Sequence, residues 1–268
     1  MKKCALHSLG CKVNSYETQA MQKMMESAGY EIVPFGEEIA DIYIINTCSV
    51  TNIADRKSRQ MIHKAKKLNP EAVVAAAGCY VESAGDNIDE DVDIVIGNNE
   101  KSHLIEILNE YFEHMDKEKS VDIGKATGFD ELNIDSPLEH TRAYVKIQDG
   151  CNRFCSYCII PYVRGRIRSR KPDDVMAEIK RVAASGCKEV VLTGIHLSSY
   201  GLDFKDSTVK LIDVIEAVNR IEGIERIRLG SLEPLIVTEE VVRRLAKCKK
   251  ICPHFQFYLQ SVCDETIK

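Results

Sequence analysis

The stretch Asp149-Gly-Cys-Asn-Arg-Phe-Cys-Ser-Tyr-Cys-Ile-Ile-Pro161 holds three cysteines, Cys151, Cys155 and Cys158, within eight residues. It directly follows an apolar segment, Ala143-Tyr-Val-Lys-Ile-Gln148, whose composition is typical of a strand. Four cysteine thiolates complete a structural zinc or iron–sulfur site. Three thiolates therefore indicate a metal cluster with one position left open, and an open metal position is where chemistry takes place.

The overall composition is that of a globular enzyme. The chain has 268 residues, 44% of them hydrophobic and 29% charged, which is enough for one large domain or two ordinary ones. No apolar run approaches the roughly 18–20 residues that span a bilayer, and the N-terminus lacks the apolar core of a signal peptide. We therefore expect a cytoplasmic protein with no membrane partner. In the reducing cytosol, the 11 cysteines are expected to be metal ligands or catalytic groups rather than disulfides.

Residues 1–116 are predicted to form an α/β domain with a parallel sheet, because apolar strands alternate with helical patterns. The predicted strands are 3–8, 41–46, 72–77 and 93–97, and the predicted helices are 14–28, 54–68 and 101–112. Residues 117–136 are polar and lack periodicity, so they are predicted to be a linker.

Three predicted strands of this first domain run straight into a cysteine, at Cys11, Cys48 and Cys79. The carboxyl ends of parallel strands lie together at one edge of the sheet, where ligands bind. The three thiols, which are 37 and 31 residues apart, are therefore predicted to converge. The alternative is three separate structural cysteines, since free cysteine is often buried.

Residues 137–268 are predicted to begin a (β/α) barrel, because strands and helices again alternate. The predicted strands are 143–148, 189–193, 226–229 and 255–259, and the predicted helices are 172–185, 208–221 and 238–247. A barrel usually has eight strands, so four strands predict an incomplete barrel and a C-terminally truncated chain. The cysteine triplet follows the first strand, at the end of the barrel that carries catalysis. A zinc knuckle or a simple electron-transfer cluster is the alternative interpretation of that triplet.

The spacing Cys151-x3-Cys155-x2-Cys158, with the aromatic Tyr157 before the last cysteine, resembles the radical S-adenosylmethionine superfamily. Further elements resemble the methylthiotransferase family within it: Cys158-Ile-Ile-Pro-Tyr-Val-Arg-Gly-Arg-Ile-Arg-Ser-Arg170, Leu9-Gly-Cys11, Asn46-Thr-Cys48 and Gly78-Cys79. Three elements resemble the branch of that family that acts on threonylcarbamoyladenosine in tRNA: Leu9-Gly-Cys-Lys-Val-Asn14, Val50-Thr-Asn52 and Thr193-Gly-Ile-His196.

The resemblance implies an α/β fold in which an N-terminal methylthiotransferase domain precedes an incomplete radical SAM (β/α) barrel. It implies S-adenosylmethionine and two [4Fe–4S] clusters, with each cysteine triplet holding one cluster. The implied reaction adds a methylthio group to C2 of N6-threonylcarbamoyladenosine next to the anticodon. A deoxyadenosyl radical abstracts the C2 hydrogen, and the cluster at Cys11, Cys48 and Cys79 donates sulfur, which a second S-adenosylmethionine methylates. The alternatives are isopentenyladenosine tRNA as substrate, or a truncated iron–sulfur protein without catalytic activity.

The resemblance also implies contacts for particular residues. Tyr157 would lie against the adenine of S-adenosylmethionine, Gly194 near its methionine part and Glu233 on its ribose hydroxyls, and no side chain is expected to act as an acid or base. The implied partners are a tRNA anticodon stem-loop and an electron donor such as flavodoxin or ferredoxin, and a monomer is expected. Four arginines after the cluster loop are predicted to contact RNA phosphates: Arg164, Arg166, Arg168 and Arg170. The basic stretch 56–67 has the same role or is a solvated helix face.

Overall fold

The computed structural model describes residues 1–114, 123, 126, 128–137, 141–259, 261, 263 and 265. They form two compact units, one made of Met1–Ile134 with Gly150–Arg166 and the other of Asp135–Asp149 with Ile167–Lys268. Segment 150–166, which carries the cysteine triplet, thus groups with the first unit rather than with the strand that precedes it. The predicted linker 117–136 lies partly outside the described residues. No helix in the described ranges combines the length and apolar character that crossing a bilayer requires.

The first unit is built on a parallel five-stranded sheet, as its alternating sequence pattern predicts. Its strands are β1 (Lys3–Ser8), β2 (Glu31–Ile32), β3 (Ile42–Thr47), β4 (Val73–Gly78) and β5 (Ile94–Ile96), in the order β2-β1-β3-β4-β5. The four predicted strands are confirmed to within two residues at either end. The two-residue strand β2 was not predicted, because so short a segment has no readable alternation.

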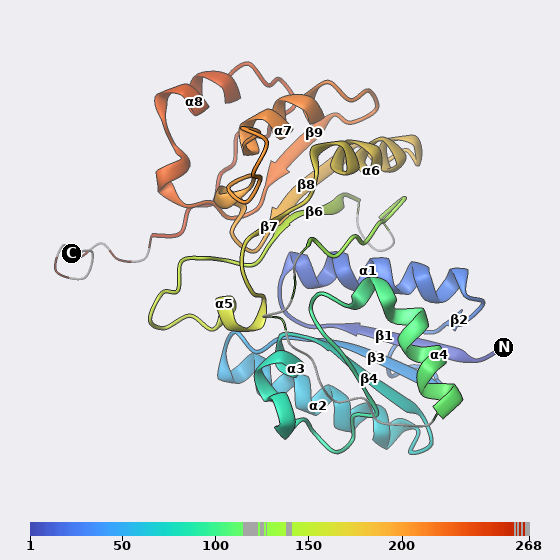
Figure 1. The fold of residues 1–268 in the computed structure, drawn as a ribbon. Helices are drawn as coiled ribbons and strands as arrows, with labels where there is room; N and C mark the ends of the chain where they lie inside the picture. The colour runs from blue at the N-terminus through green and yellow to red at the C-terminus, as the bar shows by residue number, and fades with distance from the viewer. Residues whose placement is uncertain are drawn as a thin grey trace. The chain divides into compact units, whose positions relative to one another are not determined.

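Helices cover both faces of this sheet (Figure 1). Helices α1 (Lys12–Ser27) and α4 (Leu104–His114) lie on one face, and α2 (Asn52–Leu68) and α3 (Cys79–Ala84) lie on the other. Successive strand side chains point to opposite faces, so both faces must be apolar, and this explains the continuous apolar runs of the strands.

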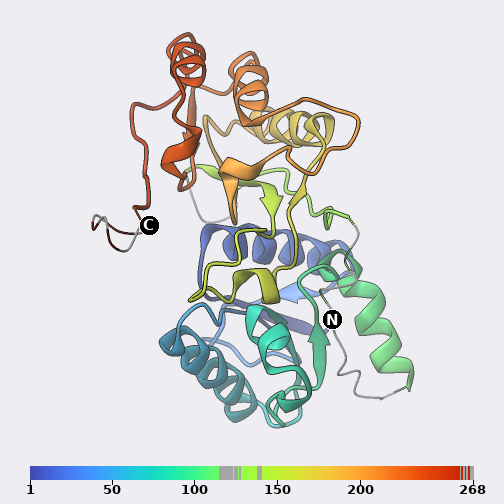
Figure 2. The ribbon, with the colours of Figure 1, turned by 60° about the vertical axis from the view of Figure 1, so that its left-hand side comes forward.

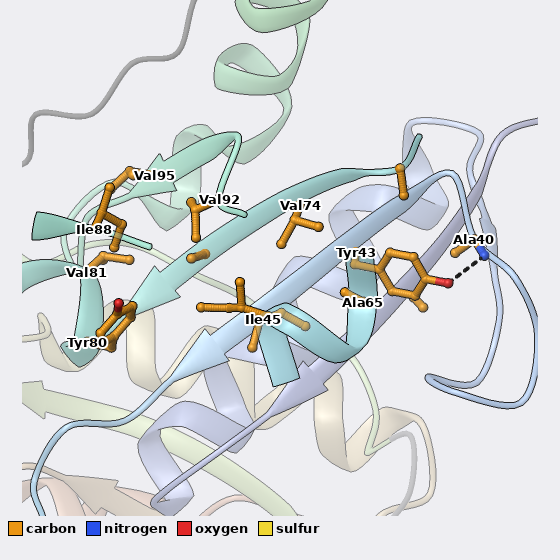
Figure 3. Packing of buried hydrophobic residues seen from close by; sticks show 14 of the residues in the cluster. Ala40, Tyr43, Ile45, Ala65, Val74, Tyr80, Val81, Ile88, Val92 and Val95 are labelled. Carbon is orange, nitrogen blue, oxygen red and sulfur yellow. Dashed lines mark hydrogen bonds between the residues drawn. The ribbon is translucent and has the colours of Figure 1, made fainter. Parts of the chain in front are cut away.

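The face under α2 and α3 shows how this core is packed. Tyr43 and Ile45 of β3 lie beneath Ala65 of α2, and Tyr80 of α3 closes one end of the cluster (Figure 3). The Tyr43 hydroxyl accepts a hydrogen bond from the backbone N–H of Ala40 at 3.1 Å, so the buried phenol is satisfied. The core therefore holds β3 and β4 rigidly up to their carboxyl ends.

The second unit has a four-stranded sheet with helices on one side of it (Figures 1 and 2). Its strands are β6 (Ala143–Asp149), β7 (Arg168–Ser169), β8 (Glu189–Gly194) and β9 (Arg226–Leu229), in the order β7-β6-β8-β9. Its helices are α6 (Pro172–Ala184), α7 (Leu211–Asn219) and α8 (Glu239–Leu245), whereas the short α5 (Ile160–Val163) belongs to the first unit. Strands β6, β8 and β9 are parallel, and β7 pairs antiparallel with β6. The predicted β/α alternation is confirmed for its first three strands.

The strand predicted at 255–259 is wrong. The chain meets β9 and its continuation only at two isolated bridges, Ile227 with Ile251 and Leu232 with Phe257. Between these bridges the backbone N–H of His254, which follows Pro253, donates to the carbonyl of Cys252 at 2.7 Å, so it is used in a tight turn and not in pairing with β9.

Candidate metal centres

Cys11, Cys48 and Cys79 lie at the same edge of the first unit's sheet, as their strand-end positions predict. Strands β1, β3 and β4 are neighbours, and their register pairs Ser8 with Asn46 and Thr47 with Gly78. Cys48 and Cys79 follow this last pair directly, and Cys11 is the residue that precedes α1. Cys48 and Cys79 are only 7% and 3% exposed, whereas Cys11 is exposed. The three thiols thus span the boundary between the core and the solvent.

Two glycines make this edge possible. Gly10 has φ +101°, and a Cβ added there would lie 2.9 Å from the Cβ of Cys48 and 3.0 Å from its Sγ. Gly78 has φ +96°, and its added Cβ would lie 2.5 Å from the carbonyl oxygen of Thr47. Side chains rarely adopt these backbone angles. Glycine at position 10 therefore keeps the space beside the Cys48 thiol open, and glycine at position 78 lets the backbone pass close to Thr47.

Polar groups surround the three cysteines. The Cys11 thiol donates to Oδ1 of Asn14 at 3.9 Å, and Nδ2 of Asn98 donates to Sγ of Cys79 at 3.9 Å. Ser58 accepts from the backbone N–H of Cys48 and donates to its carbonyl oxygen, which fixes that loop. Soft thiol ligands with nearby N–H donors are the environment of an iron–sulfur cluster, so these residues fit one.

The environment of Cys48 is electrostatically mixed. Burial raises the pKa of the Cys48 thiol, and the neighbouring Cys79 and Cys11 thiols raise it further. The backbone N–H of Val50 and the Arg164 guanidinium act in the opposite direction and lower that pKa. All three thiols are therefore near enough to influence one another, and a cation from segment 150–166 lies within reach of them.

The loop of Cys151, Cys155 and Cys158 is held by its own backbone. The N–H of Cys151 donates to the carbonyl of Gly165 at 3.0 Å, and that of Cys158 donates to the carbonyl of Cys155 at 2.9 Å. Cys151 is 8% exposed, and the other two cysteines are half-buried. Gly150, with φ +68°, is required at the start of the loop, because an added Cβ would lie 1.9 Å from the Arg166 carbonyl oxygen.

Aromatic side chains line the same loop. Phe154 has the unusual φ of +50°, and its ring meets the ring of Tyr162 edge-on at 5.6 Å. The guanidinium of Arg166 lies over the Phe154 ring, 4.3 Å from its centroid, a stabilising cation–π geometry. Tyr157 is 72% exposed to solvent, so its ring can lie against a bound cofactor.

The spacing of the thiols bears on the zinc alternative. A tetrahedral site with zinc–sulfur bonds near 2.3 Å puts its sulfurs about 3.8 Å apart. Within the described ranges, the set of three potential ligands whose atoms all lie within 4.8 Å of one another is His63, Asp89 and Asp91, on the surface away from the cysteines. Neither cysteine triplet has the spacing of a single zinc ion.

In the second unit, a small polar cluster lies at the carboxyl ends of β8 and β9. Nε2 of His196 lies 2.9 Å from Oε1 of Glu233, and Nδ1 of His196 lies 2.5 Å from Oγ of Ser199. The backbone N–H of His196 donates to Oε1 of Gln148 at 2.6 Å. An added Cβ at Gly194 would lie 2.9 Å from the Cβ of Gln148, so Gly194 has a packing reason of its own. His196 and Glu233 are therefore close neighbours at this strand end.

The four arginines after the cluster loop differ in their exposure. Arg164 and Arg170 have no exposed surface; Arg164 Nη1 donates to Glu17 Oε1 at 2.7 Å, and Arg170 pairs with Glu178. Contrary to the prediction, these two are not surface contacts for RNA phosphate, because leaving their buried carboxylates would uncover unpaired charge.

Arg166 is the exposed member of the four. Arg168 is 6% exposed, and its Nη2 lies 3.9 Å from Oδ2 of Asp149. Of the four, Arg166 therefore presents its guanidinium at the surface of the cluster loop.

The sequence analysis assigned no site role to four residues around Cys11, Cys48 and Cys79: Asn14, Glu17, Asn98 and Lys101. Asn98 follows β5 at the same sheet edge, so the strand-end argument that found Cys11, Cys48 and Cys79 could have found it. Asn14 and Glu17 lie three and six residues after Cys11 on α1, and a buried acid on a helix is a signal by itself. Lys101 carries no comparable signal.

Comparison with known families agrees with this geometry. Residues 3–97 match the family described as uncharacterized protein family UPF0004, and residues 145–268 match the radical SAM superfamily. A region that matches UPF0004 therefore precedes a region that matches the radical SAM superfamily. The fold class expected from the sequence is confirmed.

Its sequence relatives are methylthiotransferases. The chain is 41% identical over 272 residues to the threonylcarbamoyladenosine tRNA methylthiotransferase MtaB of Bacillus subtilis, covering 100% of this chain and 60% of that protein. For the enzyme of the same name from Aquifex aeolicus, the identity is 42% over 264 residues, with 97% and 63% covered. A tRNA-2-methylthio-N(6)-dimethylallyladenosine synthase of Clostridium botulinum is 34% identical over 275 residues, with 98% and 60% covered. The chain spans about three-fifths of the length of these relatives.

Solved structures resemble the chain in fold. The radical S-adenosylmethionine methyltransferase TsrM from Kitasatospora setae, with cobalamin and a [4Fe–4S] cluster bound, matches with a TM-score of 0.66 at 15% identity, covering 99% of this chain and 62% of that one. The cobalamin-dependent radical enzyme OxsB, with aqua-cobalamin and S-adenosylmethionine bound, matches with a TM-score of 0.61 at 11% identity, covering 100% and 45%. At these identities the likeness concerns the fold alone.

Proposed function

We propose that this chain acts as part of a tRNA methylthiotransferase that adds a methylthio group to C2 of N6-threonylcarbamoyladenosine next to the anticodon. The supporting observation is that two cysteine triplets occur in one compact unit, one at the sheet edge and one in the loop of residues 150–166. The threonylcarbamoyladenosine enzymes of Bacillus subtilis and Aquifex aeolicus are 41% and 42% identical to this chain, whereas the dimethylallyladenosine enzyme of Clostridium botulinum is 34% identical, which favours the former substrate. The threonylcarbamoyladenosine enzyme of Thermotoga maritima, at 33% identity, does not separate the two substrates.

The cysteine thiolates would hold two [4Fe–4S] clusters. In this proposal, the cluster on Cys151, Cys155 and Cys158 supplies the electron that cleaves S-adenosylmethionine, and the one on the sheet-edge triplet supplies sulfur. Three thiolates on each leave one coordination position open. In the loop, the buried Cys151 anchors its cluster, and the half-buried Cys155 and Cys158 leave access from solvent.

The chain's own residues would bind and orient the cofactor. The exposed ring of Tyr157 provides a stacking surface for an adenine. The Glu233 carboxylate, next to His196 at the strand end, would accept from the ribose hydroxyls. No side chain in this proposal transfers a proton.

Phosphate contacts would come from exposed cations. Besides Arg166, the surface of α2 presents several, beginning just after the Cys48 loop: Arg56, Lys57, Arg59, Lys64 and Lys67. Such contacts position RNA without reading its sequence, and an adenosine must be unpaired in a loop to be reached. Removing one phosphate-binding cation should reduce the slope of log affinity against log salt by about 0.7–0.9. We further propose that the protein works in the cytoplasm as a monomer and draws electrons from a flavodoxin or ferredoxin.

Activity can be tested on anaerobically reconstituted protein. Two four-iron clusters require roughly eight iron atoms per chain, and replacing either triplet by alanine should remove about four. With dithionite and S-adenosylmethionine, the wild-type chain should release 5′-deoxyadenosine, and the Cys151→Ala, Cys155→Ala, Cys158→Ala variant should not. A chain that holds both clusters but releases no deoxyadenosine would instead be a non-catalytic iron–sulfur protein.

The substrate can be tested separately. Transcripts carrying either threonylcarbamoyladenosine or isopentenyladenosine are incubated with the protein, digested and analysed by mass spectrometry. A methylthio product on the first RNA alone supports the proposed substrate, and a product on the second alone overturns it.

A further inference from the structure

A continuous chain of buried polar contacts joins two of the sheet-edge cysteines. It starts at the Cys11 thiol, which donates to Oδ1 of Asn14, and the same oxygen accepts from Nη2 of Arg164 at 2.6 Å. Arg164 Nη1 then donates to Oε1 of Glu17 at 2.7 Å. The cysteine and the guanidinium thus share one amide oxygen.

The series of polar contacts continues from Glu17 to Cys79, on the other side of the sheet-edge cysteine triplet. Lys101 Nζ donates to Oε2 of Glu17 at 2.8 Å and to Oδ1 of Asn98 at 2.7 Å. Nδ2 of Asn98 donates to the backbone carbonyl of Val163 at 2.6 Å and to Sγ of Cys79 at 3.9 Å. Two cations therefore flank one carboxylate, and each cation is linked to a cysteine through an asparagine.

Burial makes this arrangement informative. Arg164, Glu17 and Lys101 have no exposed surface, and buried charges are costly unless they are paired. Another buried ion pair, Arg170 with Glu178, lies in the second unit. Around Glu17, two cations share one carboxylate, and the asparagines that accept from these cations also contact the Cys11 and Cys79 thiols.

We propose that the buried positive charge of Arg164, a positioning residue held beside the sheet-edge cysteines by Asn14 and Glu17, raises the reduction potential of the cluster that Cys11, Cys48 and Cys79 hold, with Glu17 acting in the opposite direction. This inference rests on the proposed function, because it requires a cluster on that triplet. Reduction by dithionite adds one electron, and hence one negative charge, to the cluster. A nearby buried cation favours the reduced form and a buried anion disfavours it, since charge and hydrogen bonds around the sulfurs set cluster potentials.

The test uses the full 268-residue chain carrying Cys151→Ala, Cys155→Ala and Cys158→Ala, so that one cluster remains. After anaerobic reconstitution, its iron and sulfide are counted, and its potential is measured by mediated dithionite titration with electron paramagnetic resonance. Arg164→Gln should decrease the equilibrium constant for reduction at least tenfold. For a one-electron couple this lowers the potential by about 59 mV or more.

Matched variants give the sign of the effect. Glu17→Gln should raise the potential, Arg164→Lys should restore most of the Arg164→Gln loss, and Arg170→Gln should leave the potential at the background value. If Arg164 has a merely structural role, Arg164→Gln and Glu17→Gln should shift the potential in the same direction or leave it unchanged. Either result would overturn the inference. If Arg164→Gln retains no cluster, the potential of Glu17→Gln decides the test: a higher potential supports the inference, and an unchanged or lower potential overturns it. If the background protein itself holds no iron, the proposed function fails rather than this inference.

Discussion

Replacing Gly10 by alanine should crowd the sheet-edge cysteine site and weaken cluster binding there without unfolding the chain. Gly10 has φ +101°, and the new Cβ would lie 2.9 Å from the Cβ of Cys48. Ordinary contact begins near 3.4 Å, so the Cys48 loop must move by about 0.5 Å. The left-handed backbone costs about 1–2 kcal/mol, and crowding of this kind typically costs a further 1–3 kcal/mol. The lower entropy of the unfolded alanine chain offsets about 0.4–1 kcal/mol, which leaves a net loss of about 1–4.6 kcal/mol.

Gly29→Ala is the matched control. Gly29 has φ +87°, and nothing lies within 4 Å of an added Cβ. It carries the same backbone strain without crowding, so its loss should be about 1 kcal/mol. Both losses are measured by urea unfolding.

The decisive measurement is the iron and sulfide content of each variant, after reconstitution in the background without Cys151, Cys155 and Cys158. Gly29→Ala should match the background, and Gly10→Ala should hold less than half as much iron. If the two variants hold equal iron, the idea that Gly10 keeps room beside Cys48 is refuted.

Three further substitutions probe the core, the pH response and a helix end. Cys4→Ser should leave the iron content unchanged and lower the free energy of unfolding in urea by about 1–3 kcal/mol. The reason is that Cys4 is fully buried in the core, where burial raises the pKa of its thiol to about 12. Lost iron would show that Cys4 is a ligand. Burial raises the pKa of Glu189, but hydrogen bonds from Arg226 and Arg228 outweigh it and hold that pKa below the ordinary 4.5. Their stabilisation is therefore complete above pH 4.5 and is lost as the pH falls through the lowered pKa, so Glu189→Gln should flatten the acid limb of a pH series of melting curves; an unchanged limb contradicts the pairing. Thr51→Ala removes the hydroxyl that accepts from the N–H of Ala54 at the start of α2, and should cost about 1 kcal/mol by urea unfolding with no change in iron.

Local patterns determined most of the fold. The strands of the first unit are apolar on both faces and flanked by turn residues, and these are short-range properties that a sequence displays directly. The same holds for the cysteine triplet at 151–158 and for the strand-end positions of Cys11, Cys48 and Cys79. Because parallel strands share one carboxyl edge, the convergence of these three thiols follows from the order of elements alone.

The prediction at 255–259 failed for a physical reason. Alternating aromatic residues favour a strand, but a strand forms only when a neighbour pairs along its length. The two bridges to β9 and its continuation are separated by a tight turn around Pro253, in which His254 donates to Cys252 instead of to β9. The residue types at 255–259 favour a strand, but the segment lacks the continuous backbone pairing that a strand requires.

The chain by itself thus determined the class of fold, the six cysteines and the chemistry they suit, since these depend on residue type and local spacing. Only the tertiary structure decided that segment 150–166 packs into the first unit and that Arg164 is buried. Arg164 lies 147 residues from Glu17, its ion-pair partner. In sequence, a run of arginines looks like a basic surface, and whether each guanidinium meets water or a buried carboxylate is settled by which distant elements pack around it.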